Sequence, residues 1–308
     1  MNDKKVLVVG AAGLLGSKIT KALLERGADV TAMIRTTSNR SNLQEMGVKN
    51  FAVGDMLDKQ SLRNALSSKP AFDAIVSSAA GYTRHSKGDS FKTDTLGYKN
   101  LVDATKEAGI PRFVFISILE CDKAVNVPHF YNKYLIEKYL AERHQPFIAL
   151  RPGAFLDQAG DILLHKISEG IFPVFFDGVD YGTICTADLA RYVAIAATSL
   201  PNSELNSIVD VGWSTPVNSK SLAATFKKVL RKPIRTKPFI PSFVVKIIVP
   251  IMATFNSSVK DMLEMIKWVN TGAYVSSNTK RQMELFGDLP TMEEAVTRFC
   301  KDKGFLTD

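Results

Sequence analysis

The chain has 308 residues, of which 45% are hydrophobic and 23% are charged, and its 39 basic and 31 acidic side chains give a net charge of +8. This composition is ordinary for a soluble globular protein, and the length suits one large domain or a main domain with a smaller satellite. The three cysteines and four histidines show neither a C-x-x-C pair nor the spacing of metal ligands, so we expect no disulfide scaffold, no zinc or other metal site and a reducing compartment. The first residues pass directly into an apolar segment without a signal-peptide pattern, so the expected location is cytoplasmic.

The glycine-rich stretch near the N-terminus is the strongest functional signal. Four apolar residues, Val6–Val9, run into a glycine without alternation, which predicts a strand buried on both faces of a parallel sheet. A G-x-x-G-x-x-G spacing then leads into a helical pattern, and the free amides of such a helix N-terminus bind anions such as the pyrophosphate of a dinucleotide. The residues expected at this site are Gly10, Ala12, Gly13, Leu14, Leu15 and Gly16. A purely structural turn, in which small residues let the helix pack tightly on the strand, is the alternative.

Arg35 closes the predicted second strand, Asp29–Ile34, and lies 19 residues after Gly16. An NAD-preferring site usually has Asp or Glu about here, where it bonds the ribose 2′-hydroxyl. A guanidinium instead grips a 2′-phosphate by paired hydrogen bonds, so the sequence favours NADP(H) over NAD(H). An ordinary surface arginine at a strand end is the alternative.

Further apolar runs alternate with helical patterns along the chain. The expected strands cover residues 51–54, 74–78, 113–116, 147–150 and 207–211. With right-handed crossovers, this alternation predicts an α/β fold, a Rossmann-type doubly wound parallel sheet, with a smaller, mainly helical C-terminal substrate region. A long helix is expected over 93–108, with Leu96, Leu101, Val102 and Ala104 facing inward.

Residues at the carboxyl ends of these strands are candidate coenzyme ligands, because ligands of open parallel sheets collect at that edge. The candidates are Asp55, Met56, Ala79, Ala80 and Ser117. Asp55 has two interpretations, since its carboxylate either faces the adenine or caps a helix that begins near Ser61.

A predicted helix that begins at Pro128 carries two pairs of residues with i,i+4 spacing. One pair is His129 with Lys133, continued by Glu137, and the other is Tyr134 with Lys138. A tyrosine and a lysine one turn apart can form an acid–base couple, because the ammonium lowers the pKa of the phenol. The two pairs point in directions about 100° apart, so only one of them can face a coenzyme squarely.

Several of these motifs together resemble a short-chain dehydrogenase/reductase, and more narrowly the atypical NmrA-like, NAD(P)-binding branch. The motifs are the glycine stretch, Ser117 after the fifth strand, Lys133 with Glu137 and Leu140, and Arg151-Pro152-Gly153. Residues 186–190 also resemble that family's segment near the substrate domain. The likeness covers roughly the first 210 residues, and the remainder matches loosely, as expected where substrate regions diverge.

The resemblance implies roles for the residues of the predicted helix. Lys133 lies 18 positions before Arg151, which is the register of the family's lysine, whereas Lys138 lies only 13 positions before it. Lys133 would then hold the nicotinamide ribose, with Pro152, Gly153 and Phe155 also at the coenzyme. The usual catalytic tyrosine position falls on His129. Three alternatives stay open. His129 acts as the general acid, His129 has no role, or Tyr134 and Lys138 form the acid–base couple.

The C-terminal third combines a basic run with an apolar run. No Asp or Glu occurs from Val211 to Lys260, where nine Lys and Arg give a charge of +9. Residues 239–252 are strongly apolar, but they are too few and too interrupted for a comfortable membrane span, which needs about 20 apolar residues. They have two interpretations. They could form helices that line an apolar substrate pocket, or, with the basic 220–260 stretch, a peripheral contact with an anionic membrane or a protein.

We therefore predict an NAD(P)-binding domain over 1–210, with 151–190 contributing to the substrate side, and a substrate or cap region over 211–308. The favoured function is an NADPH-dependent reductase of a small apolar carbonyl, quinone or related acceptor, with a small-molecule substrate and no nucleic acid as partner. An NADP(H)-binding redox-sensing regulator without catalysis and a nucleotide-sugar epimerase or dehydratase are the alternatives. The sequence does not predict the oligomeric state.

Overall fold

A seven-stranded sheet organises the fold of the computed structural model, which describes residues 4–67, 71–81, 91–158, 160–176, 178–241, 244–276 and 278–306. Its strands are β1 (Lys5–Val9), β2 (Asp29–Ile34), β3 (Asn50–Val53), β4 (Ala74–Ser77), β5 (Phe113–Ile116), β6 (Phe147–Pro152) and β10 (Ser207–Val211). The spatial order is β10-β6-β5-β4-β1-β2-β3, and the pairings from β3 to β6 are parallel. The chain order reverses between β1 and β4, which is where open α/β sheets bind their ligands. The predicted doubly wound sheet is confirmed.

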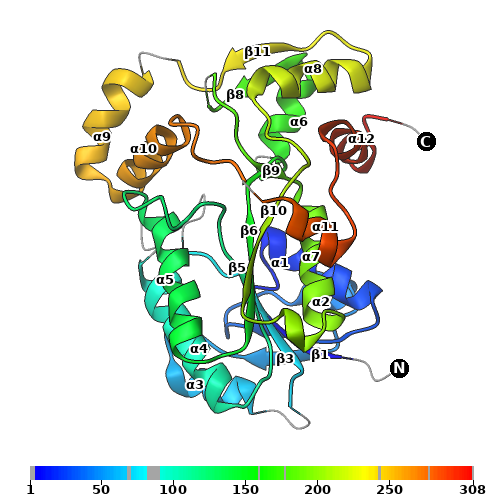
Figure 1. Cartoon of the computed structure of the whole chain (residues 1–308), viewed down its shortest axis with the longest axis vertical. Coiled ribbons are helices and arrows are strands. Elements are labelled where there is room, and N and C mark those ends of the chain that lie inside the picture. The colour runs from blue at the N-terminus through cyan, green and yellow to red at the C-terminus, as the bar shows by residue number, and fades with distance from the viewer. Residues whose placement is uncertain are drawn as a thin grey trace. The chain divides into compact units, whose positions relative to one another are not determined.

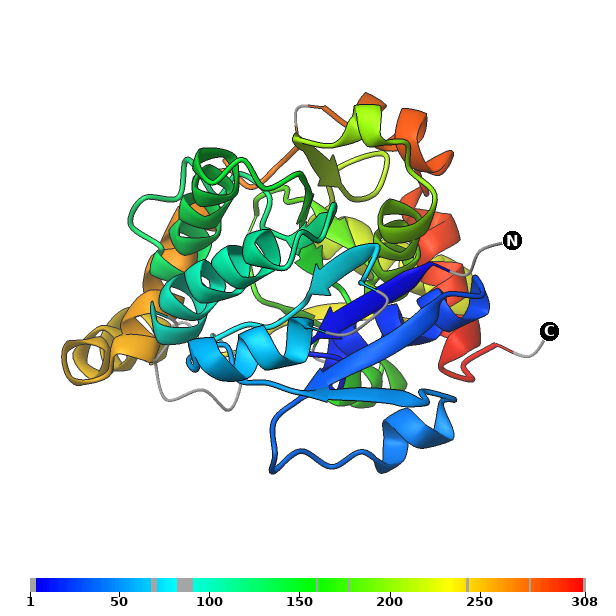
Figure 2. The same cartoon turned by 90° about the horizontal axis from the view of Figure 1, so that it is seen from below.

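Helices cover both faces of this sheet (Figures 1 and 2). One face carries α1 (Leu14–Glu25), α2 (Ser41–Glu45) and α7 (Thr186–Thr198), and the other carries α3 (Lys59–Leu66), α4 (Tyr98–Glu107) and α5 (Pro128–Glu142). Buried side chains of β1, β4 and β5 pack against α3, α4 and α5 in one apolar cluster. The successive residues of β1 from Val6 to Val9 and of β5 from Phe113 to Ile116 are all buried, so both faces of these strands are apolar and their sequences do not alternate.

The prediction that Leu96 faces inward is wrong, and the cause is a π-helical turn, η1 (Lys92–Gly97), which precedes α4. A π-turn holds more residues than an α-turn, so the inner face shifts along the sequence. Leu96 is consequently 46% exposed, while Asp94, Thr95 and Tyr98 are buried. The predicted inward residues Leu101, Val102 and Ala104 are buried.

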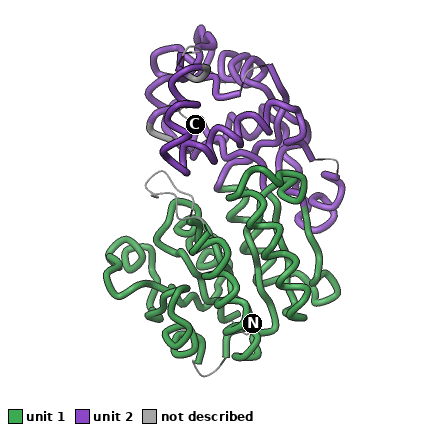
Figure 3. Tube along the Cα trace, turned by 90° about the vertical axis from the view of Figure 1, so that its left-hand side faces the viewer, with its two compact units in different colours: residues 1–151, 187–209 green, residues 152–186, 210–308 purple. Residues whose placement is uncertain are grey.

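The chain divides into two compact units, shown in different colours in Figure 3. Unit 1 comprises residues 1–151 and 187–209 and holds most of the sheet, together with a short 3-10 helix, η2 (Asn202–Glu204). Unit 2 comprises residues 152–186 and 210–308.

Unit 2 is mainly helical. Its helices are α6 (Gly160–Ser168), α8 (Ser219–Leu230), η3 (Val244–Ile248), α9 (Val249–Phe255), α10 (Ser257–Val269), α11 (Lys280–Phe286) and α12 (Met292–Asp302). Two small parallel pairs accompany them, β7 (Ala154–Phe155) with β9 (Thr183–Ile184), and β8 (Ile171–Val174) with β11 (Arg235–Pro238). In the core of this unit the Phe226 ring of α8 lies 5.7 Å from that of Phe172 and 6.0 Å from that of Phe299, between ring centres.

Candidate functional site

The N-terminus of α1 is open to an anion. Gly10 follows β1 with φ +82°, Gly13 is the N-cap of α1, and no side chain caps the helix. The first turn of α1 contains no acidic residue, and Ala12, Gly13 and Leu14 are exposed. The amides of this turn have no intrahelical partner, and they lie at the positive end of the helix dipole. The arrangement fits the phosphate groups of a dinucleotide.

Two of the glycines are required by close contacts between backbone segments. A Cβ on Gly16 would lie 1.9 Å from the carbonyl oxygen of Gly10, and a Cβ on Gly10 would lie 3.0 Å from the amide nitrogen of Ala79. Gly16 therefore lets α1 pack on the end of β1, and Gly10 lets the end of β4 approach. A Cβ on Gly13 would meet only the Gly10 oxygen, at 3.2 Å. The tight packing of the helix on the strand and the open anion site thus occur together.

Arg35 lies directly after β2 in a turn that its own backbone helps to close. Its amide donates to Ser38 Oγ at 3.1 Å, and its carbonyl accepts from the Ser38 amide at 2.9 Å. The Arg35 guanidinium is exposed and has no hydrogen-bond or ion-pair partner among the residues that the structure describes. Arg40, in contrast, lies over the Phe51 ring, 5.5 Å from its centre. A cation without a protein partner thus stands at the end of the strand that usually selects between NAD and NADP.

Asp55 does not cap the next helix, so that alternative is wrong. Helix α3 begins at Lys59, and its N-cap is Asp58, whose carboxylate accepts from the amides of Gln60 and Ser61 at 2.9 and 3.1 Å. Asp55 follows β3 and accepts from the Leu57 amide at 2.9 Å.

Met56, the neighbour of Asp55, is 7% exposed and belongs to the apolar cluster of the sheet. Its carbonyl accepts from Asn100 Nδ2 at 3.0 Å. The Met56 side chain therefore acts as a core residue.

The segment after β4 is held by a buried tyrosine and a buried aspartate. The Tyr98 hydroxyl donates to the Ala79 carbonyl at 2.7 Å, and Asp94 Oδ2 accepts from the Gly81 amide at 3.1 Å. Burial raises the pKa of Tyr98, so the hydroxyl stays a donor. Ala79 and Gly81 are half-buried, and Ala80 is exposed. Small side chains therefore line the strand end that faces the anion site.

The ammonium of Lys133, in α5, is enclosed within unit 1. Its Nζ lies 3.3 Å from Asp94 Oδ1 and 3.5 Å from the Ala79 carbonyl oxygen. It also lies 4.5 Å from the ring centre of Tyr98 and 5.3 Å from that of Phe115. Burial opposes the charge, but the oxygens of Tyr98 and Asp94 outweigh it and raise the pKa of Lys133. Lys133 therefore stays charged and joins α5 to η1 and to the end of β4.

The other two catalytic candidates lie in different surroundings. His129 is 7% exposed, and its ring lies edge-on to Phe130 with 4.7 Å between centres. Tyr134 and Lys138 line a surface cavity of about 490 Å³ that Phe147 and Ile208 also line. The Lys138 ammonium lies over the Tyr134 ring, 5.9 Å from its centre. The structure thus places Tyr134 and Lys138 together, but apart from the buried surroundings of Lys133.

Glu137 of α5 and Arg151 at the end of β6 form a buried ion pair. This pair explains why Arg151-Pro152 follows Lys133 at a fixed spacing in the sequence. Arg151 Nε and Nη2 donate to the two carboxylate oxygens of Glu137 at 2.9 and 2.6 Å, and Nη1 donates to Asp122 at 2.7 Å. Glu137 Oε1 also accepts from the Cys121 thiol at 3.8 Å. Arg151 therefore joins the end of β6 to α5, which fixes the helix that carries Lys133.

Ser117, the predicted ligand after β5, is 2% exposed, and its Oγ lies 3.6 Å from Cys121 Sγ. Burial, with a smaller effect of the Glu137 carboxylate, raises the pKa of Cys121 to about 12, so the thiol stays protonated. Ser117 and Cys121 thus continue the buried polar network of Glu137 and Arg151.

Pro152, Gly153 and Phe155 belong to unit 2. A Cβ on Gly153 would lie 2.3 Å from the Gly182 carbonyl carbon, so this glycine permits the close pairing of β7 with β9. Phe155 is half-buried in that pair.

Sequence reasoning missed Asp94, Tyr98, Cys121 and Asp122. The i,i+4 spacing of Asp94 and Tyr98 was a signal, but the expected α-helical register assigned the inner face to Leu96 instead. Asp122 and Cys121 lie in the segment between β5 and α5, where no periodic pattern marks them.

Curated proteins with sequences similar to this chain include a reductase and a photosystem II assembly factor. The 2-alkyl-3-oxoalkanoate reductase of Stenotrophomonas maltophilia is 29% identical over 222 residues, which are 63% of this chain and 66% of that protein. The photosystem II assembly factor Ycf39 of Synechocystis is 30% identical over 152 residues, 49% of this chain and 45% of that protein. The chain spans about half the length of the first curated relatives it matches, from 45% to 57%.

Solved structures share the fold at low identity. Triphenylmethane reductase of Citrobacter sp., complexed with NADP(H), has a TM-score of 0.75 at 17% identity, and the likeness covers 95% of this chain and 99% of that one. The NADPH-dependent quinone oxidoreductase QOR2 of Escherichia coli, complexed with NADPH, has a TM-score of 0.73 at 16% identity, covering 96% and 99%. The sequence profile of the NmrA-like family matches residues 2–295. The chain therefore belongs to the NmrA-like family.

Proposed function

We propose that this protein is an NADPH-dependent reductase that acts on a small apolar carbonyl, quinone or related acceptor. The observation that carries the proposal is the uncapped N-terminus of α1 together with the unpartnered guanidinium of Arg35, which follow the neighbouring strands β1 and β2. The amides of α1 suit the pyrophosphate, and Arg35 suits the 2′-phosphate that distinguishes NADPH from NADH. The two structural relatives that were solved in complex with NADPH or NADP(H) support the same coenzyme.

The residues of unit 1 fit the roles that binding and hydride transfer require. The bound coenzyme supplies the hydride. In this proposal Gly10, Gly13 and Gly16 admit the phosphates, and Asp55, Ala79 and Ala80 border the adenosine half. Lys133 keeps a fixed positive charge beside the segment after β4. In this proposal that charge stabilises the negative charge that develops on the acceptor oxygen during hydride transfer. His129 and Tyr134 are the remaining candidates for proton donation.

A redox-sensing regulator that binds NADP(H) without turnover is the second candidate. Two observations favour it. The ammonium of Lys133 is already paired with Asp94, and His129, which stands at the family's tyrosine position, is buried against Phe130. A pair that is satisfied inside unit 1 gives structural support to the loop after β4 without requiring any reaction.

One assay separates the two candidates. The protein is mixed with NADPH and a panel of quinones and aldehydes, and the absorbance of the reduced nicotinamide is followed. The reductase proposal predicts consumption of NADPH that depends on an acceptor of the panel. Saturable NADPH binding without consumption would establish the sensor instead, and the absence of both would contradict both.

A further inference from the structure

Unit 2 exposes a row of large apolar side chains along η3 and α9. These side chains, here called the apolar stripe, are Ile247, Ile248, Ile251, Met252 and Phe255, with exposed fractions of 60, 42, 58, 50 and 89%. Their spacing of three and four residues places them on one side of a helical segment. Val249, on the other side, is 6% exposed. The segment therefore has its apolar surface outside as well as inside, which is unusual for a helix that only faces water.

Exposed apolar side chains are concentrated in the apolar stripe and are sparse in the rest of the described chain. Sixteen large hydrophobic side chains are exposed among the residues that the structure describes, and five of them lie within the nine residues from 247 to 255. Phe175 and Phe239 are exposed as well, at 41 and 40%, and their rings lie 4.7 Å apart at the ends of β8 and β11. Phe239 directly follows β11, and η3 and α9 are the next helices along the chain.

Cations flank the apolar stripe along the chain, and acidic residues are missing from the same stretch of sequence. Residues 211–260 contain no Asp or Glu. Arg235 and Lys237 of β11 and Lys260 of α10 are exposed, so cations precede and follow the stripe along the chain. Ser242, Phe243 and the Lys246 side chain lie outside the described residues. An apolar helical side with flanking cations is the pattern of a segment that lies in the interface of an anionic bilayer.

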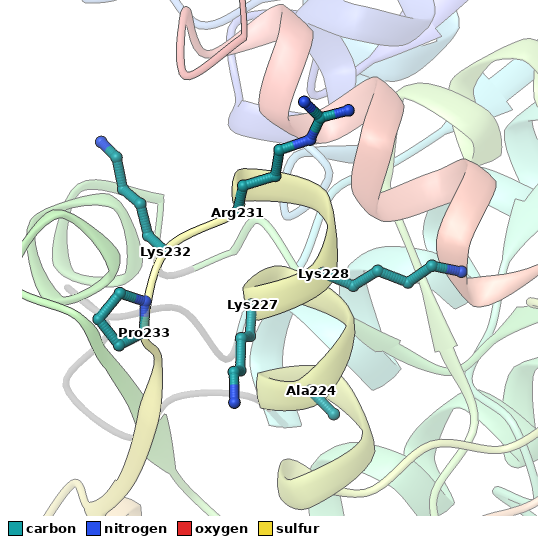
Figure 4. A pocket seen from close by; sticks show the side chains of 6 residues that line it. All are labelled: Ala224, Lys227, Lys228, Arg231, Lys232 and Pro233. Carbon is teal, nitrogen blue, oxygen red and sulfur yellow. The ribbon is translucent and has the colours of Figure 1, made fainter.

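The cations at the end of α8 do not form a discrete anion site. Lys227, Lys228, Arg231 and Lys232 line a surface hollow of about 430 Å³. Figure 4 shows these four side chains leaving the backbone in different directions, so they do not converge on one point. Lys228 is also paired with Glu293, at 2.6 Å. These residues therefore contribute a diffuse positive potential, which attracts an anionic surface more readily than a single small anion.

We infer that the apolar stripe is a docking surface for an anionic lipid bilayer, on which η3 and α9 lie with Ile247, Ile251 and Phe255 in the acyl boundary. Arg235, Lys237 and Lys260 contact the lipid headgroups. No helix among the described residues is long and apolar enough to cross a membrane. This inference is independent of the proposed reductase activity. A second copy of the chain or an apolar substrate would use the stripe but gain nothing from the cations that flank it in the sequence.

Vesicle flotation of the 308-residue chain tests this inference. The vesicles are phosphatidylcholine alone, or two parts phosphatidylcholine with one part phosphatidylglycerol. The wild type is expected to float with the anionic vesicles at low salt and to be released at high salt, because the ionic part of the attraction is screened. The double variant Ile251→Asp/Phe255→Asp is expected to stay at the bottom of the gradient. The control Met283→Asp alters an apolar side chain of unit 2 that is 49% exposed, and it is expected to float as the wild type does.

A charge variant and an optical variant complete the test. Arg235→Gln/Lys237→Gln is expected to bind about twenty-five-fold more weakly, since each cation near the surface contributes about a factor of five. Lys49→Gln/Lys59→Gln, which removes two exposed cations of unit 1, is the matched control and leaves binding unchanged. In Phe255→Trp, anionic vesicles shift the added tryptophan emission to the blue as the ring enters the acyl boundary.

Three results would overturn the inference. The first is the absence of flotation by the wild type. The second is flotation that the Ile251→Asp/Phe255→Asp variant retains. The third is a wild type that does not float, together with an Ile251→Asp/Phe255→Asp variant that self-associates less than the wild type or has a higher KM for an acceptor. That result would assign the stripe to a second copy of the chain or to the substrate.

Discussion

At the scale of single residues, the most informative side chains are those that the sequence placed correctly but whose partners it did not reveal. Lys133 and Glu137 are one turn apart on α5, as predicted. Their charges pair in different places, Lys133 with Asp94 and Glu137 with Arg151. Both partners come from other elements, and a single sequence carries no signal for such long-range pairs. The opposite case is Arg35, whose environment, an exposed position after a buried strand, follows from the local pattern.

The Arg35→Ala variant tests the selection of the coenzyme. We expect NADPH to bind about tenfold to a hundredfold more weakly, because a hydrogen bond to a charged group contributes about 1.5–3 kcal/mol, and NADH binding to stay unchanged. Titration of both coenzymes by calorimetry measures this. Arg63→Ala, which removes an exposed arginine of α3 paired with Glu107, controls for net charge. Equal weakening of NADPH and NADH would show that Arg35 does not contact the 2′-phosphate.

The buried pair of Lys133 and Asp94 makes a prediction about stability. Asp94→Asn leaves the ammonium buried without its anion and is expected to lower the free energy of unfolding by about 3–5 kcal/mol. The double variant Lys133→Met/Asp94→Asn removes both charges and is expected to lose clearly less. Urea unfolding of the three proteins gives the comparison. If the double variant were as unstable as the single variant, the pairing would not be the source of the loss.

At the scale of secondary-structure elements, the sequence predicted most of the sheet and several helix ends. The ranges of β2, β5 and β10 agree with the predicted strands, and α5 begins at Pro128 as expected. A capping box of Thr291 with Glu294 opens α12. These elements have local causes, namely unbroken apolar runs, a proline at a helix start and a capping pair. The π-turn η1 has no such local mark, since Lys92–Gly97 reads as an ordinary helical stretch and only tertiary packing reveals the extra residue per turn.

Leu96 and Leu101, both in the helix predicted over 93–108, test the change of helical register that the π-turn η1 introduces. Leu96→Ala is expected to change the free energy of unfolding by less than about 0.5 kcal/mol, because the side chain is 46% exposed. Leu101→Ala is expected to cost about 2–5 kcal/mol, because that side chain is fully buried. The same chemical change is made in both variants, so urea unfolding compares the two positions directly. Equal losses would mean that Leu96 faces the core.

At the scale of the whole molecule, the sequence predicts an NAD(P)-binding part over 1–210, with 151–190 contributing to the substrate side, followed by a more helical part, and the segments that bear on this division are residues 152–186 and 187–209. The first segment packs in unit 2 and the second in unit 1, so the chain passes between the units more than once. The assignment of 211–308 to the substrate stays a prediction.

The buried thiols give the molecule a predicted sensitivity to alkaline pH. The pKa of Cys121 is raised from 9.0 to about 12 by burial, and that of Cys300 to about 11. Above pH 9 the unfolded chain loses these protons while the folded chain keeps them, so stability falls as pH rises. The raised pKa of Lys133 acts in the same direction, since its contribution is complete below the unfolded value of 10.5 and is lost as pH rises through the folded pKa.

Cys121→Ala isolates the contribution of one thiol to this pH dependence. Over the first pH unit above 9, we expect the variant to lose about 1 kcal/mol less unfolding free energy than the wild type loses. Urea unfolding at the two pH values measures the difference, which does not depend on the constant cost of removing the sulfur. Parallel losses in both proteins would show that the thiol is ionised to the same extent in the folded and unfolded chains.

The most direct test of the central claim is calorimetric titration of NADPH into the wild type and into Gly13→Asp. An aspartate at this N-cap, which has extended φ and ψ of −75° and 169°, caps α1 with its own carboxylate and occupies the amides proposed for the phosphates. We predict saturable binding to the wild type, at least about a hundredfold weaker binding to Gly13→Asp, and an unfolding temperature of the variant that is not lowered. Saturable binding that is equally tight in the variant, or no saturable binding to the wild type, would contradict the placement of the coenzyme at the N-terminus of α1.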